Sequence, residues 1–379
     1  MKKFLAMLLA LAMVFSLAAC SGGNDGKTNP DTSNPNNIDD NPTTSDGKYE
    51  IAMITDEGQL KDGSFNECTW NGVKLYAAQN NKTYKYYQPA NGNEATDEDR
   101  YDAYQAAVEG GAKVIVAPGY MQEVAMRRSA SENPDVSYIF IDGYSLNDDN
   151  GNLLTNVAGI AFQEEQCGYL AGYAIVKEGF TKLGFSGGGG GTVPSCCRYG
   201  YGYVQGANAA AADMGVQVEM RYSWQNGATF SASDALQNQM QGWYETGTEI
   251  VFACGGTMFN SISAAAAAAE QYVVGVDVDQ SGQSDTVVTS AMKDLIQSVN
   301  ITLNAFYNNK FDDFGGKSTS LGAKDDAVAL PTDTWSMEKF SVADYEKLLA
   351  GIKDGSLSVD ADYESGLEQA WSNLTLTIE

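Results

Sequence analysis

Histidine is absent from the 379-residue sequence, so the side chain most often used as a general acid or base near neutral pH is missing. The most common protein ligand of transition metals is missing with it. Cysteine is also scarce, with six in the chain, and those that follow Cys20 show no Cys-x-x-Cys spacing. This arrangement matches neither a disulfide framework nor a zinc site. We therefore expect mainly free thiols in the core. The sequence does not decide whether the neighbouring Cys196 and Cys197 form a strained disulfide.

Basic residues are few as well. The chain has 23 lysines and arginines against 49 aspartates and glutamates, which gives a formal net charge of −26. This excess of acid opposes binding to nucleic acids and to anionic membrane surfaces. It does not identify a ligand, because an acidic surface commonly serves solubility alone.

Patterns typical of enzyme active sites are missing too. The glycine run Gly187–Gly191 follows a predicted strand, but it lacks the Gly-Lys-Ser/Thr ending of a phosphate loop and the spacing of a dinucleotide motif. We interpret it as a flexible loop at the edge of a cleft. Asp277 and Asp279 suggest a cation site, but no suitably spaced glutamate completes a calcium loop. The sequence therefore predicts a binding protein rather than an enzyme, with no cofactor and no metal.

The N-terminal residues are typical of an exported protein. A basic start is followed by an apolar run, Phe4 to Ala19, which is short for a bilayer span. Residues 17–20 (LAAC) resemble the lipobox of bacterial lipoproteins, which implies a signal peptide over residues 1–19, cleavage before Cys20 and acylation of its thiol. An ordinary secretory signal with a chance cysteine is the alternative. Residues 20–47 are almost without apolar side chains and predict a disordered, lipid-anchored stalk. We expect a protein attached to a bacterial cell membrane and facing away from the cytoplasm.

From about residue 48 the chain alternates short apolar runs with helical patterns. The predicted strands are Glu50–Thr55, Lys113–Ala117, Tyr138–Asp142, Lys182–Ser186, Val216–Tyr222, Glu249–Ala253, Val273–Val276 and Thr286–Ser290. Their nearly continuous apolar character is typical of parallel strands covered on both faces. The pattern predicts an α/β fold of two lobes, each a parallel sheet flanked by helices. We expect an N-terminal lobe at 48–160, completed by about 286–320, and a C-terminal lobe at 161–285, completed by about 321–379.

The first predicted strand ends at a candidate ligand-binding residue. In α/β sheets, residues after the carboxyl ends of strands line the ligand crevice. Asp56 has this position and can accept hydrogen bonds there. Phe65 opens the next predicted helix, where its ring is expected either to face a ligand or to pack in the core.

Several pieces of the chain, in order, resemble the basic membrane protein family of substrate-binding lipoproteins, whose members include purine nucleoside receptors of ABC importers. The matching pieces are residues 51–66 (IAMITDEGQLKDGSFN), 97–101 (DEDRY), 114–120 (VIVAPGY), 139–143 (IFIDG), 166–173 (QCGYLAGY), 275–280 (GVDVDQ) and 288–293 (VTSAMK). The resemblance implies a two-lobed fold like that of type I periplasmic binding proteins. The connecting strands are then expected near residues 157–163 and 284–292.

The same resemblance implies a nucleoside, expected to be a purine nucleoside, held between the lobes. Phe65 would stack on the base, and Asp56 and Asn66 would hydrogen-bond polar groups near it. Asp142 and Asp277 would accept from the ribose hydroxyls, and Lys293 would donate to the ribose. Gly256 and Phe259 would bring backbone and a second ring to the base, with Met258 or Trp224 as alternatives to Phe259. Ionised carboxylates only accept hydrogen bonds, which suits the two donors of a diol.

The sequence therefore predicts a monomeric binding protein that closes over a nucleoside and delivers it to the permease and ATPase of an ABC importer. The same fold with a pyrimidine nucleoside or a sugar is one alternative. A surface nucleoside hydrolase is another, although Asp56 and Asp62 are too few for its calcium site. A regulatory or adhesive surface lipoprotein without a transport role is the third.

Overall fold

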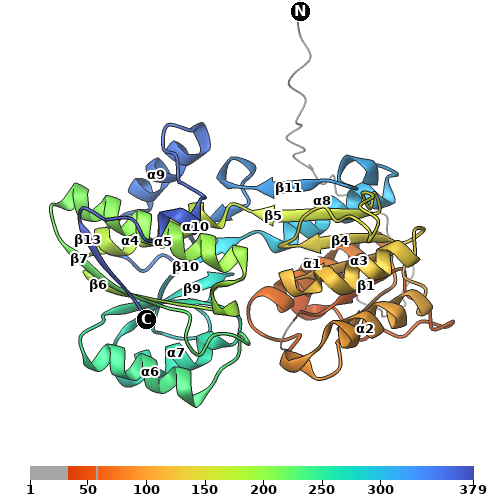
Figure 1. Cartoon of the computed structure of the whole chain (residues 1–379), viewed down its shortest axis with the longest axis horizontal. Helices are drawn as coiled ribbons and strands as arrows, with labels where there is room; N and C mark the ends of the chain where they lie inside the picture. The colour runs from red at the N-terminus through yellow and green to blue at the C-terminus, as the bar shows by residue number, and fades with distance from the viewer. Residues whose placement is uncertain (1–32, 57–58) are drawn as a thin grey trace, which may run out of the picture.

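The computed structural model describes residues 33–56 and 59–379, so the expected signal peptide and Cys20 lie outside the described residues. The described chain forms two lobes side by side, each built on a sheet covered by helices (Figure 1). The predicted α/β class with parallel sheets is confirmed.

The first lobe is built on a six-stranded parallel sheet. Its strands, in spatial order, are β11 (Ser318–Leu321), β5 (Val157–Phe162), β4 (Ser137–Ile141), β3 (Val114–Pro118), β1 (Ile51–Ile54) and β2 (Tyr84–Tyr87). Its helices are α1 (Phe65–Asn80), α2 (Asp97–Glu109), α3 (Glu123–Glu132) and α8 (Leu295–Tyr307). Successive side chains of a strand point to opposite faces. In β1, Met53 packs into one core cluster with Trp70 of α1, whereas Ile54 packs into another with Tyr104 of α2.

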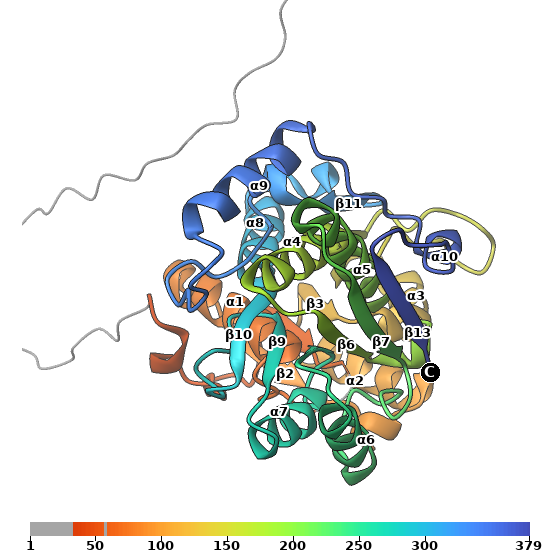
Figure 2. The ribbon, with the colours of Figure 1, turned by 90° about the vertical axis from the view of Figure 1, so that its left-hand side faces the viewer.

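The second lobe is built on a seven-stranded sheet, and this lobe faces the viewer in Figure 2. Its strands, in spatial order, are β12 (Val328–Ala329), β10 (Val287–Lys293), β9 (Tyr272–Asp277), β8 (Ile250–Cys254), β6 (Lys182–Gly187), β7 (Val218–Ser223) and β13 (Leu374–Ile378). Its helices are α4 (Glu164–Glu178), α5 (Pro194–Met214), α6 (Asp234–Glu245), α7 (Met258–Ala268), α9 (Val342–Asp354) and the short α10 (Tyr363–Gly366). Only β12 runs antiparallel to its neighbour in this sheet.

The chain crosses between the lobes after β5, after β10 and after β11. The expectation that the chain returns to the first lobe at about residue 286 is wrong, because β10 pairs with β9 of the second sheet. The return begins with α8, which packs against α1. The apolar run of β10 fits a buried strand in either lobe, so the sequence pattern alone did not assign it.

Some of the residues between 33 and 47, which the sequence assigned to a disordered stalk, are ordered and pack on the first lobe. Residues Pro35–Asn37 form a short 3₁₀ helix, and Ile38 packs against the core. The Asp40 carboxylate accepts hydrogen bonds from Lys74 Nζ at 2.7 Å and from Trp70 Nε1 at 2.9 Å. The Lys74 side chain is only 1% exposed, and a buried ammonium requires such a partner. The prediction of a disordered segment up to residue 47 is therefore wrong for this part of the chain.

Helices α4 and α5 pack unusually closely because glycines lie at their contact. A Cβ atom at Gly202 would lie 2.0 Å from the Glu165 carbonyl oxygen, and one at Gly168 would lie 2.2 Å from the carbonyl oxygen of Tyr199. Neither position therefore has room for a side chain. This close approach holds the start of α5 next to the end of β9, which contributes to the site described next.

Candidate ligand-binding cleft

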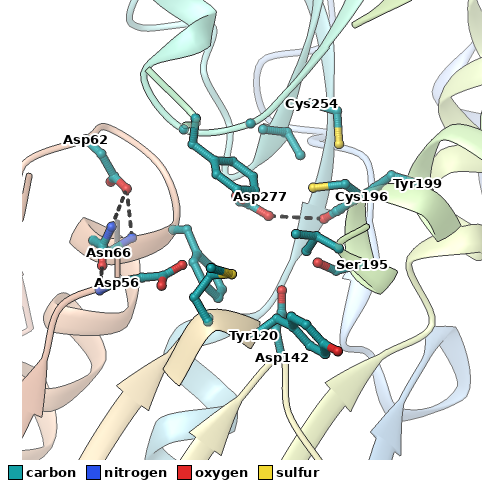
Figure 3. Close-up of a pocket in the computed structure, with 18 of the residues that line it drawn as sticks. Asp56, Asp62, Asn66, Tyr120, Asp142, Ser195, Cys196, Tyr199, Cys254 and Asp277 are labelled. Carbon is teal, nitrogen blue, oxygen red and sulfur yellow. Dashed lines mark hydrogen bonds between the residues drawn. The ribbon is translucent and has the colours of Figure 1, made fainter. Parts of the chain in front are cut away.

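A cavity lies between the two lobes, with about 610 Å³ of empty space when the solvent at its mouth is included (Figure 3). All but one of the predicted site residues line it, namely Asp56, Phe65, Asn66, Asp142, Gly256, Asp277 and Lys293. The remaining lining residues are Asp62, Gly119, Tyr120, Met121, Val193, Ser195, Cys196, Tyr199, Phe230, Cys254, Gly255 and Val276.

Lys293 is the cation of the cavity wall, and three carboxylates surround it. Its Nζ lies 2.6 Å from Asp142 Oδ2, 3.4 Å from Asp277 Oδ1 and 3.9 Å from Glu164 Oε1. Burial alone would lower the pKa of Lys293, but the negative charges of these carboxylates outweigh it and raise the pKa above the usual value. The ammonium therefore stays charged. It also lies 4.5 Å from the ring centroid of Phe65, within reach of a cation–π contact.

Asp142 and Asp277 occupy equivalent places in the two lobes. Asp142 directly follows β4, and Asp277 is the last residue of β9. Both have left-handed backbone conformations, with φ of 59° and 65°, which aspartate adopts more readily than most residues. The turn brings each carboxylate to the carboxyl edge of its sheet. The buried Oδ1 of Asp142 has no hydrogen-bond partner within the described chain, so an acceptor is available in the cavity.

Asp277 also links the lobes directly. The Ser64 hydroxyl, just before α1 in the first lobe, donates to Asp277 Oδ2 at 2.8 Å. The Tyr199 hydroxyl of α5 donates to Asp277 Oδ1 at 3.3 Å, as Figure 3 shows. Asp277 is thus held from both sides of the cleft.

Asn66 has a role in the first lobe that the sequence did not indicate. Its Oδ1 accepts from the Asp56 backbone N–H at 2.8 Å, and its Nδ2 donates to Asp62 Oδ2 at 3.1 Å. Asp62 is partly buried, and desolvation raises its pKa to about 6 even though several N–H groups donate to it. The asparagine therefore positions the loop that carries Asp56 (Figure 3). The Asp56 carboxylate lies where a Cβ atom of Gly119 would be, so a glycine is required at position 119.

Phe230, and not Phe259, is the phenylalanine that the second lobe brings to the cavity, which Tyr120 and Tyr199 also line. Phe259 lies in the first turn of α7, is 2% exposed and packs in a core cluster with α6, as Met258 does. Trp224 packs on the rings of Phe185 and Tyr222 and does not line the cavity. The prediction that Phe259 meets a ligand is therefore wrong in this geometry.

Phe230 comes from the segment between β7 and α6 and has a φ of 55°. The only signal for it in the sequence is a single aromatic residue among small and polar ones (NGATFSAS, residues 226–233). The glycine run explains how it is held. A Cβ atom at Gly188 would lie 2.3 Å from the Phe230 ring, and one at Gly187 would lie 2.1 Å from Trp224. The run makes room for rings rather than for phosphate.

Within residues 33–56 and 59–379, no group of three or more cysteine, aspartate and glutamate side chains is arranged to hold a metal ion. In the same residues, no helix is both long enough and apolar enough to span a bilayer.

Comparison with known proteins agrees with this architecture. A solute-binding protein of an ABC transporter from Aeropyrum pernix K1 has a TM-score of 0.67 at 19% identity, covering 84% of this chain and 96% of that one. A second one, from Conexibacter woesei, has a TM-score of 0.61 at 20% identity, covering 83% and 99%. The expected two-lobed fold of the type I periplasmic binding proteins is thereby confirmed.

Sequence relatives identify the family. The nucleoside-binding protein BmpA of an ABC transporter from Lactococcus lactis is 26% identical, over 93% of this chain and 96% of that protein. Basic membrane protein B of Borrelia garinii is 30% identical, over 75% and 81%. The family model for PnrA-like ABC transporter substrate-binding proteins matches residues 49–360. Because these are binding proteins, the hydrolase alternative is excluded. The chain belongs to the family of PnrA-like substrate-binding proteins of ABC transporters.

Proposed function

We propose that this protein captures a purine nucleoside outside the cytoplasm for an ABC importer, and that a lipid on Cys20 holds it at the membrane. The observation that carries the proposal is the combination in one cavity of Lys293 with Asp142 and Asp277, together with an aromatic ring from each lobe. The relative from Lactococcus lactis, which carries the description nucleoside-binding, supports the same ligand class.

The polar part of the cavity suits a ribose. A vicinal diol offers two O–H donors, and the carboxylates of Asp142 and Asp277 offer acceptors. Lys293 lies between them and can donate to a ribose oxygen. Hydrogen bonds to charged groups are stronger than neutral ones, at about 1.5–3 kcal/mol each.

The aromatic part suits a base. Phe65 belongs to the first lobe and Phe230 to the second, so closure of the lobes brings one ring from each side to a flat ligand. Stacking of a base on an aromatic ring contributes about 1–3 kcal/mol. The polar edge of the base would face the Asp56 loop, which Asn66 holds in place.

The charge of the cavity argues against a nucleotide. Asp56, Asp62, Asp142 and Asp277 line the cavity, and Lys293 is already shared among carboxylates. A phosphate would therefore meet uncompensated negative charge. We expect the nucleoside to bind and its monophosphate to be rejected.

Transport follows from closure of the lobes. The crossings after β5, β10 and β11 form the hinge, and ligand contacts from both lobes favour the closed form. The permease and ATPase subunits then receive the closed, loaded form of a monomeric binding protein.

Titration calorimetry with the mature protein tests the ligand. We expect adenosine, guanosine or inosine to bind, while ribose, adenine and adenosine monophosphate bind far more weakly. A preference for uridine or for a pentose would replace the proposed ligand class by one of the alternatives. Tight binding of the monophosphate, with no binding of any nucleoside, would contradict the proposal.

Two variants test the assigned roles. Asp277→Ala is expected to lose most of the affinity that depends on the ribose, by about 10–100-fold. Any weak binding of the free base should survive this change. Equal losses for base and nucleoside would show that Asp277 does not contact the ribose. The anchor is tested separately, because incorporation of labelled palmitate in cells should be lost in Cys20→Ala.

A further inference from the structure

Two cysteines from distant parts of the sequence meet in the wall of the cavity. Cys196 is the third residue of α5, and Cys254 is the last residue of β8. Their side chains lie next to each other, and both line the cavity between the lobes (Figure 3). We propose that Cys196 and Cys254 form a reversible disulfide in this wall, and that the bridge weakens binding of the cleft ligand. The second part rests on the function proposed above.

The other thiols have different surroundings. Cys197 donates to the Gly191 carbonyl oxygen at 3.4 Å, and Cys167 donates to the Glu164 carbonyl oxygen at 3.4 Å. Adjacent residues of a helix point about 100° apart, because 3.6 residues complete a turn. The thiols of Cys196 and Cys197 therefore diverge. Cys196, Cys197 and Cys254 are all free thiols in this structure, so no bridge joins the two neighbours.

The cleft is the route by which an oxidant reaches the pair. Cys196 is 6% exposed and Cys254 is 1% exposed. Because both line the cavity, reagents approach them through the opening between the lobes. An occupied cleft would therefore shield them.

Cys196 is the better nucleophile of the two. It is the more exposed of the two, so a reagent in the cleft reaches it first. Burial, by contrast, raises the pKa of Cys254 well above its usual value. Cys254 is therefore assigned the resolving role.

The oxidant is a small, uncharged disulfide such as 2-hydroxyethyl disulfide, because the acidic cavity would oppose an anion. The Cys196 thiolate attacks one of its sulfurs, which breaks the S–S bond and releases one 2-mercaptoethanol thiol. The Cys254 thiolate then attacks the Cys196 sulfur of the mixed disulfide and releases the second 2-mercaptoethanol thiol. The two cysteines lose two electrons to the oxidant, and their two protons end on the two released thiols. Dithiothreitol reverses the exchange.

Forming the bond would move the backbone that faces the ligand. Sulfurs in a disulfide are about 2.05 Å apart, which is closer than two free thiols can approach. The end of β8 is followed directly by Gly255 and Gly256, which also line the cavity. Drawing Cys254 toward α5 would displace these two residues. Loss of one good hydrogen bond to the ligand would weaken binding about tenfold.

The bridge is tested first without any ligand. The mature protein is incubated with 2-hydroxyethyl disulfide, free thiols are alkylated, and intact mass and peptide mapping locate the linkage. The wild type and the control Cys197→Ser should each lose two thiols to a bridge between Cys196 and Cys254, and dithiothreitol should restore both thiols. Cys254→Ser should instead trap a 2-mercaptoethanol adduct on Cys196, and Cys196→Ala should form no bridge. Thermal melts show whether each variant is folded. Survival of every thiol in the folded wild type, or a bridge between other cysteines, would overturn the proposal.

The effect on the ligand is tested second, with adenosine as the probe. Saturating adenosine should slow the bridging, and the oxidised wild type should bind adenosine about tenfold more weakly than the reduced form. Equal affinities of the two forms would overturn the coupling to the ligand. If the bridge forms but the reduced protein binds no nucleoside, the proposed function fails while the thiol pair stands.

Discussion

The ammonium of Lys293 lies 2.6 Å from Asp142 Oδ2, and this ion pair joins the lobes inside the cleft. Lys293 ends a strand of the second sheet, and Asp142 follows a strand of the first. The chain crosses to the first lobe directly after Lys293, so the pair lies at the hinge as well as in the cavity. Ligand recognition and the connection of the lobes thus share one charged group.

Lys293→Met should therefore destabilise the protein strongly. It leaves the carboxylates of Asp142, Asp277 and Glu164 without their shared cation, and breaking a buried ion pair typically costs about 3–5 kcal/mol. Urea unfolding monitored by fluorescence gives the free energy of unfolding. As a control, Lys347→Met removes an exposed pair with Asp344 and should change this free energy by less than about 1 kcal/mol. Similar effects for both variants would show that the buried network is not stabilising.

Phe65→Ala and Phe230→Ala should separate binding from stability. Each removes a ring that is only partly buried and lines the cavity, so nucleoside affinity should fall by about 10–100-fold. Phe259→Ala should do the reverse, because its ring is buried in the core and its loss costs about 3–5 kcal/mol of stability. Calorimetry and thermal melts on the same samples give both quantities. A large fall in melting temperature for Phe65→Ala, with little change in affinity, would favour a purely core role.

Glu165 should make stability depend on pH. Burial, together with the negative charge of Glu164, raises its pKa to about 7, although Arg198 opposes this. An unfolded glutamate titrates near 4.3, so between about pH 4.3 and 7 the folded protein keeps a proton that the unfolded chain has lost. The free energy of unfolding therefore falls as the pH rises through this window and does not recover above it.

Glu165→Gln removes this contribution. Between pH 5 and pH 8 the wild type should lose about 2–3 kcal/mol more stability than the variant does. Urea unfolding at both pH values measures the difference. Parallel profiles for the two proteins would mean that the carboxyl of Glu165 is ionised in the folded state throughout this range.

The sequence predicted those parts of the fold whose signal is local. The strands that became β1, β3, β4, β6, β8 and β9 have continuous apolar runs, and a buried parallel strand needs little else. The edge strands β11 and β13 were not predicted, because their exposed faces carry polar side chains such as Ser318, Thr375 and Thr377. Membership of β10 in one lobe or the other depends on tertiary pairing, which no local pattern records.

In the cleft, too, the sequence predicted the residues with a local signal and missed those that depend on tertiary packing. Residues directly after strand ends, such as Asp56 and Asp142, were placed correctly at the cavity because the sheet edge determines their position. Phe230 was missed and Phe259 misplaced, because the direction in which a loop or first-turn ring points depends on packing against the neighbouring layers. Asp40 was assigned to a stalk for a similar reason. Its partner Lys74 looks like any surface lysine until the helix that carries it is packed.

Replacing glycine by alanine should have opposite effects at two helix positions, Gly202 of α5 and Gly242 of α6. At Gly202, a Cβ atom would lie 2.0 Å from a backbone oxygen of α4, and backbone cannot move aside as a flexible side chain can. Gly202→Ala should therefore destabilise the protein by about 1–3 kcal/mol or more. At Gly242 of α6 a Cβ atom would meet nothing within 4 Å, and alanine favours a helix over glycine by about 1 kcal/mol. Gly242→Ala should thus stabilise the protein slightly, as urea unfolding would show. If both substitutions were stabilising, the close approach of the helices would be wrong, and with it the position of Tyr199 beside Asp277.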